Sequence, residues 1–140
     1  MIANGTHVRA LGGLPSSIDD DKLAPFFGPA GRRLKEWVGA EAYSDAEQST
    51  PADPDRAAAL KDSEAYLVLY YVAPRLNMVM EDSGIITYKI VGSSSDEFTY
   101  LSPRDLEELR QVWLRDALSA CRTYIIKADV TVGVSAVEEE

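Results

Sequence analysis

A run of nine residues without a charge, 65–73, limits what this chain can fold into. The run reads AYLVLYYVA and has no polar face, so a helix through it must be buried on most of its sides. Asp53 can cap the start of such a helix, and Pro54 suits its first position. These signals predict a long helix over residues 55 to about 80, with a kink or a break caused by Pro74.

A second long helix is predicted over residues 103–127. Apolar side chains recur there at spacings of three and four, which places them on one face of a helix: Leu106, Leu109, Trp113, Ala117, Ala120 and Tyr124. The sequence Ser102-Pro103 supplies a cap residue and a proline at the expected start.

Two short helices are expected before the long ones. Ser17, three residues before Asp20, has the spacing of a capping box, and Pro25 should end that first helix. The second should run over residues 29–38, with Gly39 in the turn that follows its last residue.

Strand-like patterns occupy two other regions. Residues 84–91 and 98–101 are rich in β-branched and aromatic residues and enclose a Gly-Ser-Ser-Ser-Asp stretch, which predicts a β-hairpin over 84–101. Residues 128–140 alternate valine with polar residues, and residues 1–17 contain glycines and proline without a helical period. We therefore expect both ends to be extended.

The sequence thus predicts a mainly α fold, a small helical bundle of two short and two long helices with an inserted β-hairpin. The domain comprises residues 18–127, between an N-terminal arm over 1–17 and a C-terminal tail over 128–140. Helical spacing selects ten residues for the core: Leu34, Trp37, Leu60, Leu67, Leu69, Leu106, Leu109, Trp113, Leu118 and Tyr124.

The net charge of -9, from 23 acidic and 14 basic residues, argues against tight nucleic-acid binding. An acidic surface beside DNA would instead let the DNA slide past. No stretch approaches the length of a membrane span, and no signal-type segment follows Met1, so we expect a cytosolic protein or one assembled inside a cell. The single cysteine, Cys121, should pack in the core.

The sequence contains no arrangement that predicts catalysis, a metal site or a cofactor site. His7, the only histidine, has no partner ligands in the sequence and should be exposed. The acidic run 19–21 lacks the spacing of a calcium loop and is better explained as a helix start. The hydroxyls of 93–95 have no histidine to activate them. We therefore expect the protein not to be an enzyme.

Contacts with other proteins are the more plausible role. Tyr66, Tyr70 and Tyr71 lie in the buried run, so some of their hydroxyls must reach polar partners or a subunit boundary. The tail has unpaired backbone groups that either the internal hairpin or another subunit's sheet could satisfy, and the N-terminal arm raises the same question. The residues predicted to contact partners are Val8, Leu11, Tyr88, Ser94, Asp96, Phe98, Tyr100, Val130, Val132 and Val134.

Two stretches resemble the head–tail adaptor (connector) proteins of long-tailed bacteriophages. Residues 34–43, LKEWVGAEAY, are similar to a helix that ends in glycine and is followed by a Glu-x-Tyr step. Residues 57–69, AAALKDSEAYLVL, are similar to the alanine-rich second core helix of that family, with its LK-x-A/S-E stretch. The layout matches over residues 18–126, whereas the hairpin and the tail match no motif.

The resemblance implies a non-enzymatic virion protein of the neck, made in the host cytoplasm and assembled as a ring of twelve subunits. It also implies contact with the portal protein and with a stopper or tail-completion protein, and a lumen through which double-stranded DNA passes without tight binding. The alternative is a small helical protein-interaction domain of a bacterial cytosolic complex, also without enzymatic activity. Measuring the oligomeric state separates the two.

Overall fold

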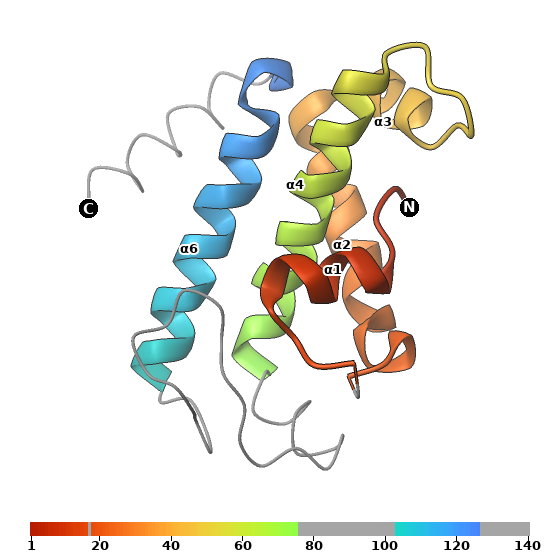
Figure 1. Cartoon of the computed structure of the whole chain (residues 1–140). Helices are drawn as coiled ribbons and strands as arrows, with labels where there is room; N and C mark the ends of the chain where they lie inside the picture. Colours follow the sequence, from red (N-terminus) through yellow and green to blue (C-terminus); the bar gives the residue numbers. More distant parts are fainter. Residues whose placement is uncertain (17, 76–102, 127–140) are drawn as a thin grey trace.

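The computed structural model describes residues 1–16, 18–75 and 103–126, where all regular structure is helical (Figure 1). The α-helices there are α1 (Gly5–Gly12), α2 (Asp20–Val38), α3 (Ala40–Ala46), α4 (Pro54–Val72) and α6 (Pro103–Cys121). Two 3₁₀ turns, η1 (Ala73–Arg75) and η2 (Arg122–Tyr124), follow α4 and α6. The predicted mainly α fold is confirmed; the predicted hairpin at 84–101 and the tail at 128–140 lie outside the described residues.

Helix α4 is the centre of the bundle. The helices α1, α2, α3 and α6 all pack against it, α6 most extensively (Figure 1). Its buried residues point to every side of the helix, as the uncharged run predicts: Ala57, Leu60, Ser63, Glu64, Ala65, Leu67, Val68, Leu69, Tyr70 and Val72. Over residues 63–72 only Tyr66 and Tyr71 keep partial exposure, so this half of the helix has little surface for water.

The two ends of α4 follow the predicted signals. The side chain of Asp53 accepts a hydrogen bond from the backbone N–H of Arg56 at 3.1 Å, and Pro54 stands at the first helical position. The α-helix ends at Val72 and continues as the 3₁₀ turn η1, which contains Pro74. The predicted break is therefore confirmed, while the predicted extension to residue 80 lies outside the described residues.

The extended N-terminal arm predicted over residues 1–17 is wrong, because residues 5–12 form helix α1. Asn4 caps this helix by accepting from the N–H of His7 at 2.9 Å, and Gly13 ends it with a φ of 67°. The glycines that suggested an irregular arm permit close packing instead. A Cβ added at Gly12 would lie 2.5 Å from the side chain of Leu69 in α4.

The predicted separation of two short helices at Pro25 is also wrong. Helix α2 runs from Asp20 to Val38 with Pro25 and Pro29 inside it. Each proline removes a backbone hydrogen bond, but burial on one face keeps the helix continuous: Leu23, Ala30, Gly31, Leu34, Trp37 and Val38 are buried. Its cap is Asp19, which accepts from the N–H of Lys22, and not the predicted Ser17, which lies outside the described residues.

The predicted core is confirmed. Seven of the ten residues are buried, and Leu106, Leu109 and Tyr124 are partly buried against the same cluster. The predicted core placement of Cys121 is confirmed too, and burial raises the pKa of its thiol. The sequence did not predict the contribution of the first 23 residues to the core, where Val8, Ile18 and Leu23 are fully buried.

Candidate functional site

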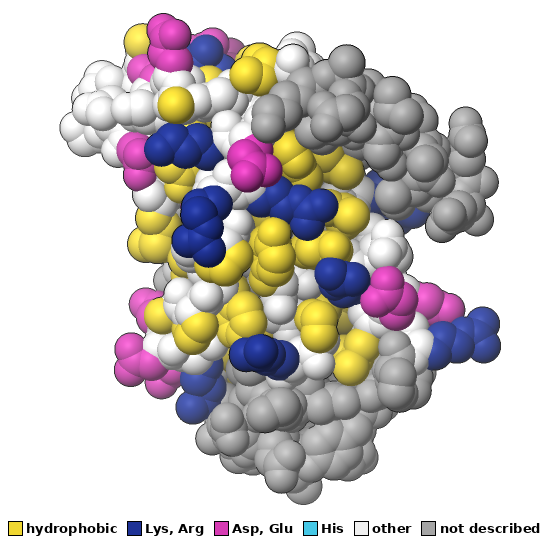
Figure 2. Space-filling view, turned by 180° about the vertical axis from the view of Figure 1, so that it is seen from behind, with side chains coloured by type: hydrophobic (Ala, Val, Ile, Leu, Met, Phe, Trp, Pro, Cys, Tyr) yellow, Lys and Arg dark blue, Asp and Glu magenta, His cyan; other side chains and the backbone are white. Residues whose placement is uncertain are grey.

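The helices α2 and α6 are the walls, and α4 the floor, of a groove that contains one hollow beside α2 and another beside α6. Both helices pack against α4 but hardly touch one another, and α1 covers α4 only on the opposite side (Figure 1). Figure 2 shows the side away from α1, where hydrophobic side chains cover the middle of the face and Lys and Arg side chains lie among them. Acidic side chains lie mainly toward its margins, although the whole chain is strongly acidic.

Two arginines from opposite walls meet over a tyrosine of the floor. The guanidinium carbon of Arg33 in α2 lies 5.2 Å from the ring centroid of Tyr70, and that of Arg110 in α6 lies 4.1 Å from it. Arg33 also lies over the ring of Trp37, at 5.5 Å, and donates to the hydroxyl of Tyr71 at 3.5 Å. Stacking on aromatic rings holds both guanidinium groups in place by cation–π attraction.

Two hollows flank these residues. We call these residues and the two hollows together the arginine–tyrosine groove. The hollow on the α2 side has a volume of about 440 Å³ and is lined by Pro29, Arg32, Arg33, Glu36 and Tyr71. The hollow on the α6 side has a volume of about 200 Å³ and is lined by Pro74, Leu106, Glu107 and Arg110. The three arginines therefore have two glutamates for neighbours, and the groove is mildly basic.

The arginines of the groove keep hydrogen-bond donors available. Arg110 forms an ion pair with Glu107 through one terminal nitrogen at 3.6 Å, while its buried Nε has no hydrogen-bond partner among the described residues. A guanidinium held flat in this way can bind a carboxylate through two parallel hydrogen bonds. Arginine, tyrosine and tryptophan are also the residues enriched where proteins bind one another.

A second polar cluster surrounds the carboxylate of Glu64, which is fully buried in α4. One oxygen accepts from the backbone N–H groups of Ile2 and Ala3, both at 2.6 Å, and the other accepts from the hydroxyl of Tyr43 at 2.5 Å. Burial, and then the hydrogen bond to Glu64, raise the pKa of Tyr43 well above its usual value. All of these groups are satisfied, so the cluster fastens the N-terminal segment and α3 to α4.

Further polar contacts hold α1 in place. His7 was predicted to be exposed, but its Nε2 lies 2.7 Å from a carboxylate oxygen of Asp62 and its side chain is partly buried. Met1 forms an ion pair through its amino group with Glu47. These contacts connect the N-terminal segment to the end of α3 and to α4.

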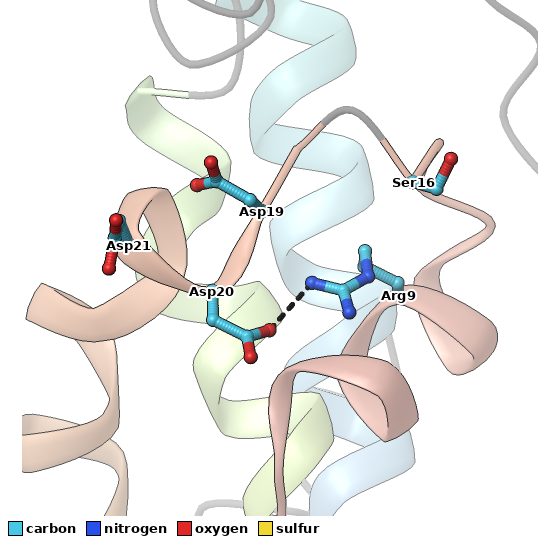
Figure 3. A pocket seen from close by; sticks show the side chains of 5 residues that line it. All are labelled: Arg9, Ser16, Asp19, Asp20 and Asp21. Carbon is cyan, nitrogen blue, oxygen red and sulfur yellow. Dashed lines mark hydrogen bonds and ion pairs between the residues drawn. The ribbon is translucent and has the colours of Figure 1, made fainter.

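The acidic run at the start of α2 holds no ligand set. Figure 3 shows Arg9 of α1 pointing into this pocket toward Asp20, with which it forms an ion pair at 2.8 Å, while Asp19 and Asp21 point elsewhere. Asp19 serves as the helix cap, in agreement with the prediction of a helix start. Because an arginine already compensates the charge, the pocket is a contact between α1 and α2.

The three tyrosines of the uncharged run lie in two different surroundings. Tyr70 and Tyr71 belong to the arginine–tyrosine groove, as described above. Tyr66 is partly buried, and burial together with the negative charges of Asp116 and Asp62 raises the pKa of its hydroxyl. The prediction that some of these hydroxyls reach polar partners is confirmed for Tyr71, which accepts from Arg33.

Only two of the residues predicted to contact partners are described, and neither lies in the groove. Val8 is completely buried within its own chain and Leu11 is partly buried against the core, since both belong to α1. Neither lies on a free arm. The others lie outside the described residues: Tyr88, Ser94, Asp96, Phe98, Tyr100, Val130, Val132 and Val134.

The described residues also bear on metals and membranes. Across residues 1–16, 18–75 and 103–126, no three His, Cys, Asp or Glu side chains gather where they could hold a metal ion. Within the same residues, no helix is both long enough and apolar enough to cross a membrane.

The Gly31→Ala variant tests how tightly the Glu64 cluster is packed. A Cβ at this position in α2 would lie 2.7 Å from the hydroxyl of Tyr43 and 3.0 Å from Glu64 Oε1. We expect overpacking to cost about 1–3 kcal/mol, less about 1 kcal/mol gained from helix propensity, so the free energy of unfolding should fall. Urea denaturation measures the change.

The control for this variant is the same substitution in a Tyr43→Phe background. The phenylalanine lacks the hydroxyl that the new methyl group would meet, so Gly31→Ala should cost less there. An equal cost in both backgrounds would mean that Tyr43 does not set the packing limit at Gly31.

Comparisons with protein-family models, with curated proteins and with solved structures gave no match to this chain.

Proposed function

We propose that the chain is a structural assembly subunit, and that the arginine–tyrosine groove is its principal contact with neighbouring proteins. The observation that carries this proposal is the meeting of Arg33 and Arg110 over Tyr70 in a face that no described helix covers. Such a face offers aromatic area together with fixed cationic donors, which are the usual anchors of a protein interface. No arrangement for acid–base or nucleophilic catalysis accompanies it among the described residues.

The more specific proposal is a head–tail adaptor of a long-tailed bacteriophage. The two stretches that carry the resemblance, 34–43 and 57–69, form one physical unit. Tyr43 of the Glu-x-Tyr step donates its hydrogen bond to Glu64 of the LK-x-S-E stretch. This bond joins α3 to α4, so the two resembling stretches are in direct contact in the folded chain.

In this proposal the chain forms a ring, of twelve subunits if it follows the family, in the neck of the virion. The ring joins the portal protein to a stopper or tail-completion protein and surrounds the passing DNA. Residues of the hairpin region and of the tail, with Val130, Val132 and Val134 foremost, supply further contacts between chains. A contact between different patches of identical subunits closes into a ring when the rotation allows it.

The test is the oligomeric state of the purified chain, measured by native mass spectrometry and electron microscopy. We expect closed rings for the natural sequence and loss of rings for an R33E/R110E double variant whose helical circular dichroism is unchanged. If that variant unfolds, Arg110→Gln, which removes only one charge, should still weaken assembly. Rings that persist undiminished in a folded groove variant would exclude the groove as the contact.

The matched control is Arg104→Glu on the same helix. Arg104 is highly exposed and, among the described residues, pairs with Glu108 one turn away, so its reversal should leave assembly intact. A chain that stays monomeric at every concentration would contradict the ring and favour a small helical interaction domain of a bacterial cytosolic complex.

A separate prediction concerns DNA. We expect the isolated protein to bind random duplex DNA no more tightly than micromolar at physiological salt, because submicromolar binding requires neutralising several phosphates. The net charge is -9, and the arginines of the groove have Glu36 and Glu107 beside them. Fluorescence anisotropy with a labelled duplex measures this affinity. Submicromolar binding that R33E/R110E abolishes would show instead that the groove holds phosphates.

A further inference from the structure

We propose that in the isolated chain the arginine–tyrosine groove is occupied by the acidic C-terminal segment of the same molecule, residues 127–140. This inference goes beyond the proposed function, since it concerns what fills the groove before any other protein binds. It depends on where the described chain ends, on the length and chemistry of the remaining segment, and on the exposed donors of the groove.

The described chain ends beside the groove. The backbone N–H of Ile126 donates to the backbone carbonyl of Trp37 at 2.8 Å, and the ring of Trp37 lies under the guanidinium of Arg33. The side chain of Ile126 reaches Gly39, where an added Cβ would lie 3.1 Å from its Cδ1. The last described residue therefore lies at the C-terminal end of α2, the helix that forms one wall of the groove.

The segment is long enough to cross the groove. An extended chain spans up to about 3.3 Å per residue, so residues 127–140 reach roughly 45 Å. Packed helix axes lie only about 8–10 Å apart, so this length exceeds the distance across α2, α4 and α6. Because the segment is attached, its effective concentration at the groove is on the order of millimolar, and a weak contact suffices to hold it.

The chemistry of the segment complements the groove. Its sequence is KADVTVGVSAVEEE, in which apolar residues precede three consecutive glutamates. The groove offers apolar lining from Pro29, Pro74 and Leu106, together with arginine donors whose hydrogen bonds within the described residues are few or long. Carboxylates binding to the terminal nitrogens of Arg33 and Arg110 would supply these donors with strong acceptors.

Glu36 and Glu107 oppose this binding, because they bring negative charge into the two hollows. Arg32, Arg33 and Arg110 outnumber them, and Glu107 is already paired with Arg110. The resulting attraction is modest. A groove held by modest attraction to its own tail remains accessible to a stronger partner, which would have to displace the segment in order to bind.

Disulfide trapping in the full chain tests the proposal. A cysteine at Glu36, which lines the groove, is paired with a cysteine at Val137, ahead of the glutamates. The control pairs Glu41→Cys in α3 with Val137→Cys, since Glu41 is exposed and even closer along the chain to Gly39, beside which the tail begins. Cys121 is buried and should not compete.

We expect the Glu36 pair to form an intramolecular disulfide faster than the Glu41 pair under mild oxidation. R33E/R110E should remove the difference in rate between the two pairs. Adding E138K/E139K/E140K to that variant should restore the difference, because the tail then carries the positive charges and the groove the negative ones. Equal rates for the two pairs in the otherwise natural sequence would overturn the proposal. So would disulfides formed only between chains, because the groove would then hold the tail of another copy. The trapping is done at a dilution at which native mass spectrometry shows monomer, so that no neighbouring subunit competes for the groove and a failure here would leave the proposed function standing.

Discussion

Replacing Glu64 by alanine should lower the free energy of unfolding by about 2–5 kcal/mol, because three buried or partly buried donors lose their only acceptor. The backbone N–H groups of Ile2 and Ala3 and the hydroxyl of Tyr43 all donate to this one carboxylate. Part of the loss should be recovered, because the variant no longer buries a charge. Urea denaturation followed by circular dichroism measures the net change.

The Glu64→Gln variant keeps both the shape of the side chain and its capacity for hydrogen bonds. Glutamine has nearly the same volume, its amide oxygen can accept from both backbone N–H groups, and its NH₂ can donate to Tyr43. It should therefore cost less than alanine. Glu108→Ala, which removes an exposed carboxylate from α6, should stay within about 0.5 kcal/mol. If Glu64→Ala unfolds at the same urea concentration as the natural chain, the Glu64 cluster does not stabilise the fold.

Amide hydrogen exchange of the same variant gives a local readout. The contacts around Glu64 help to fasten residues 1–14 to α3 and α4, so losing the central acceptor should raise exchange in α1 more than in α6. A uniform rise over both helices would point to global destabilisation instead of local release of the N-terminal segment.

The Trp113→Ala variant should lose about 3–5 kcal/mol of stability, since it removes a large side chain from the contact between α6 and α4. Trp113 is only 4% exposed, and α6 is attached to the bundle mainly through α4. A domain of this size is stabilised by about 5–15 kcal/mol in total, so the loss should shift the melting temperature by many degrees.

The neighbouring Val112→Ala variant is the control for Trp113→Ala. Val112 lies beside Trp113 on the same helix but is 37% exposed, so it should change stability far less. A Trp113→Ala protein that melts at the temperature of the natural chain would contradict the core assignment. Equal losses for both variants would show that burial does not set the effect, since helix propensity favours alanine at both positions.

Sequence patterns predicted the long helices well because their determinants are local. Asp53 and Pro54 fix the start of α4, Pro74 ends its regular part, and the spacing of leucines and Trp113 identifies the buried face of α6. These signals act within a few residues of one another. They can therefore be recognised in the sequence without knowing the tertiary structure.

The errors arose where distant contacts override local preferences. Helix α1 has glycines at its ends and few strong helix formers, and it is held by contacts with α4 that no local pattern contains. Pro25 would end an isolated helix, but the burial of Leu23 and Leu34 on either side of it keeps α2 continuous. Asn4 before α1 and Gly13 after it were the local cap signals that could have identified this helix.

The candidate site was predicted only in part. The uncharged run suggested that its tyrosines meet polar groups, but Arg33, Tyr70 and Arg110 are far apart in sequence and come together only through the packing of α2 and α6 on α4. Glu64 did leave a signal. It lies four residues after Leu60 and three before Leu67, so a charged residue occupies the apolar face of a helix that has no other face to turn to water.

The central position of α4 determines where the sequence of this protein can change. Each outer helix presents one side to solvent, where new side chains alter charge or recognition without disturbing the interior. The second half of α4, residues 63–72, has almost no such side, and an altered residue there meets a different neighbour in each direction. Adaptation to a new partner is therefore confined to the outer surfaces of α2, α3 and α6, together with the arginines that bound the groove, while the helix beneath them is held nearly constant by packing.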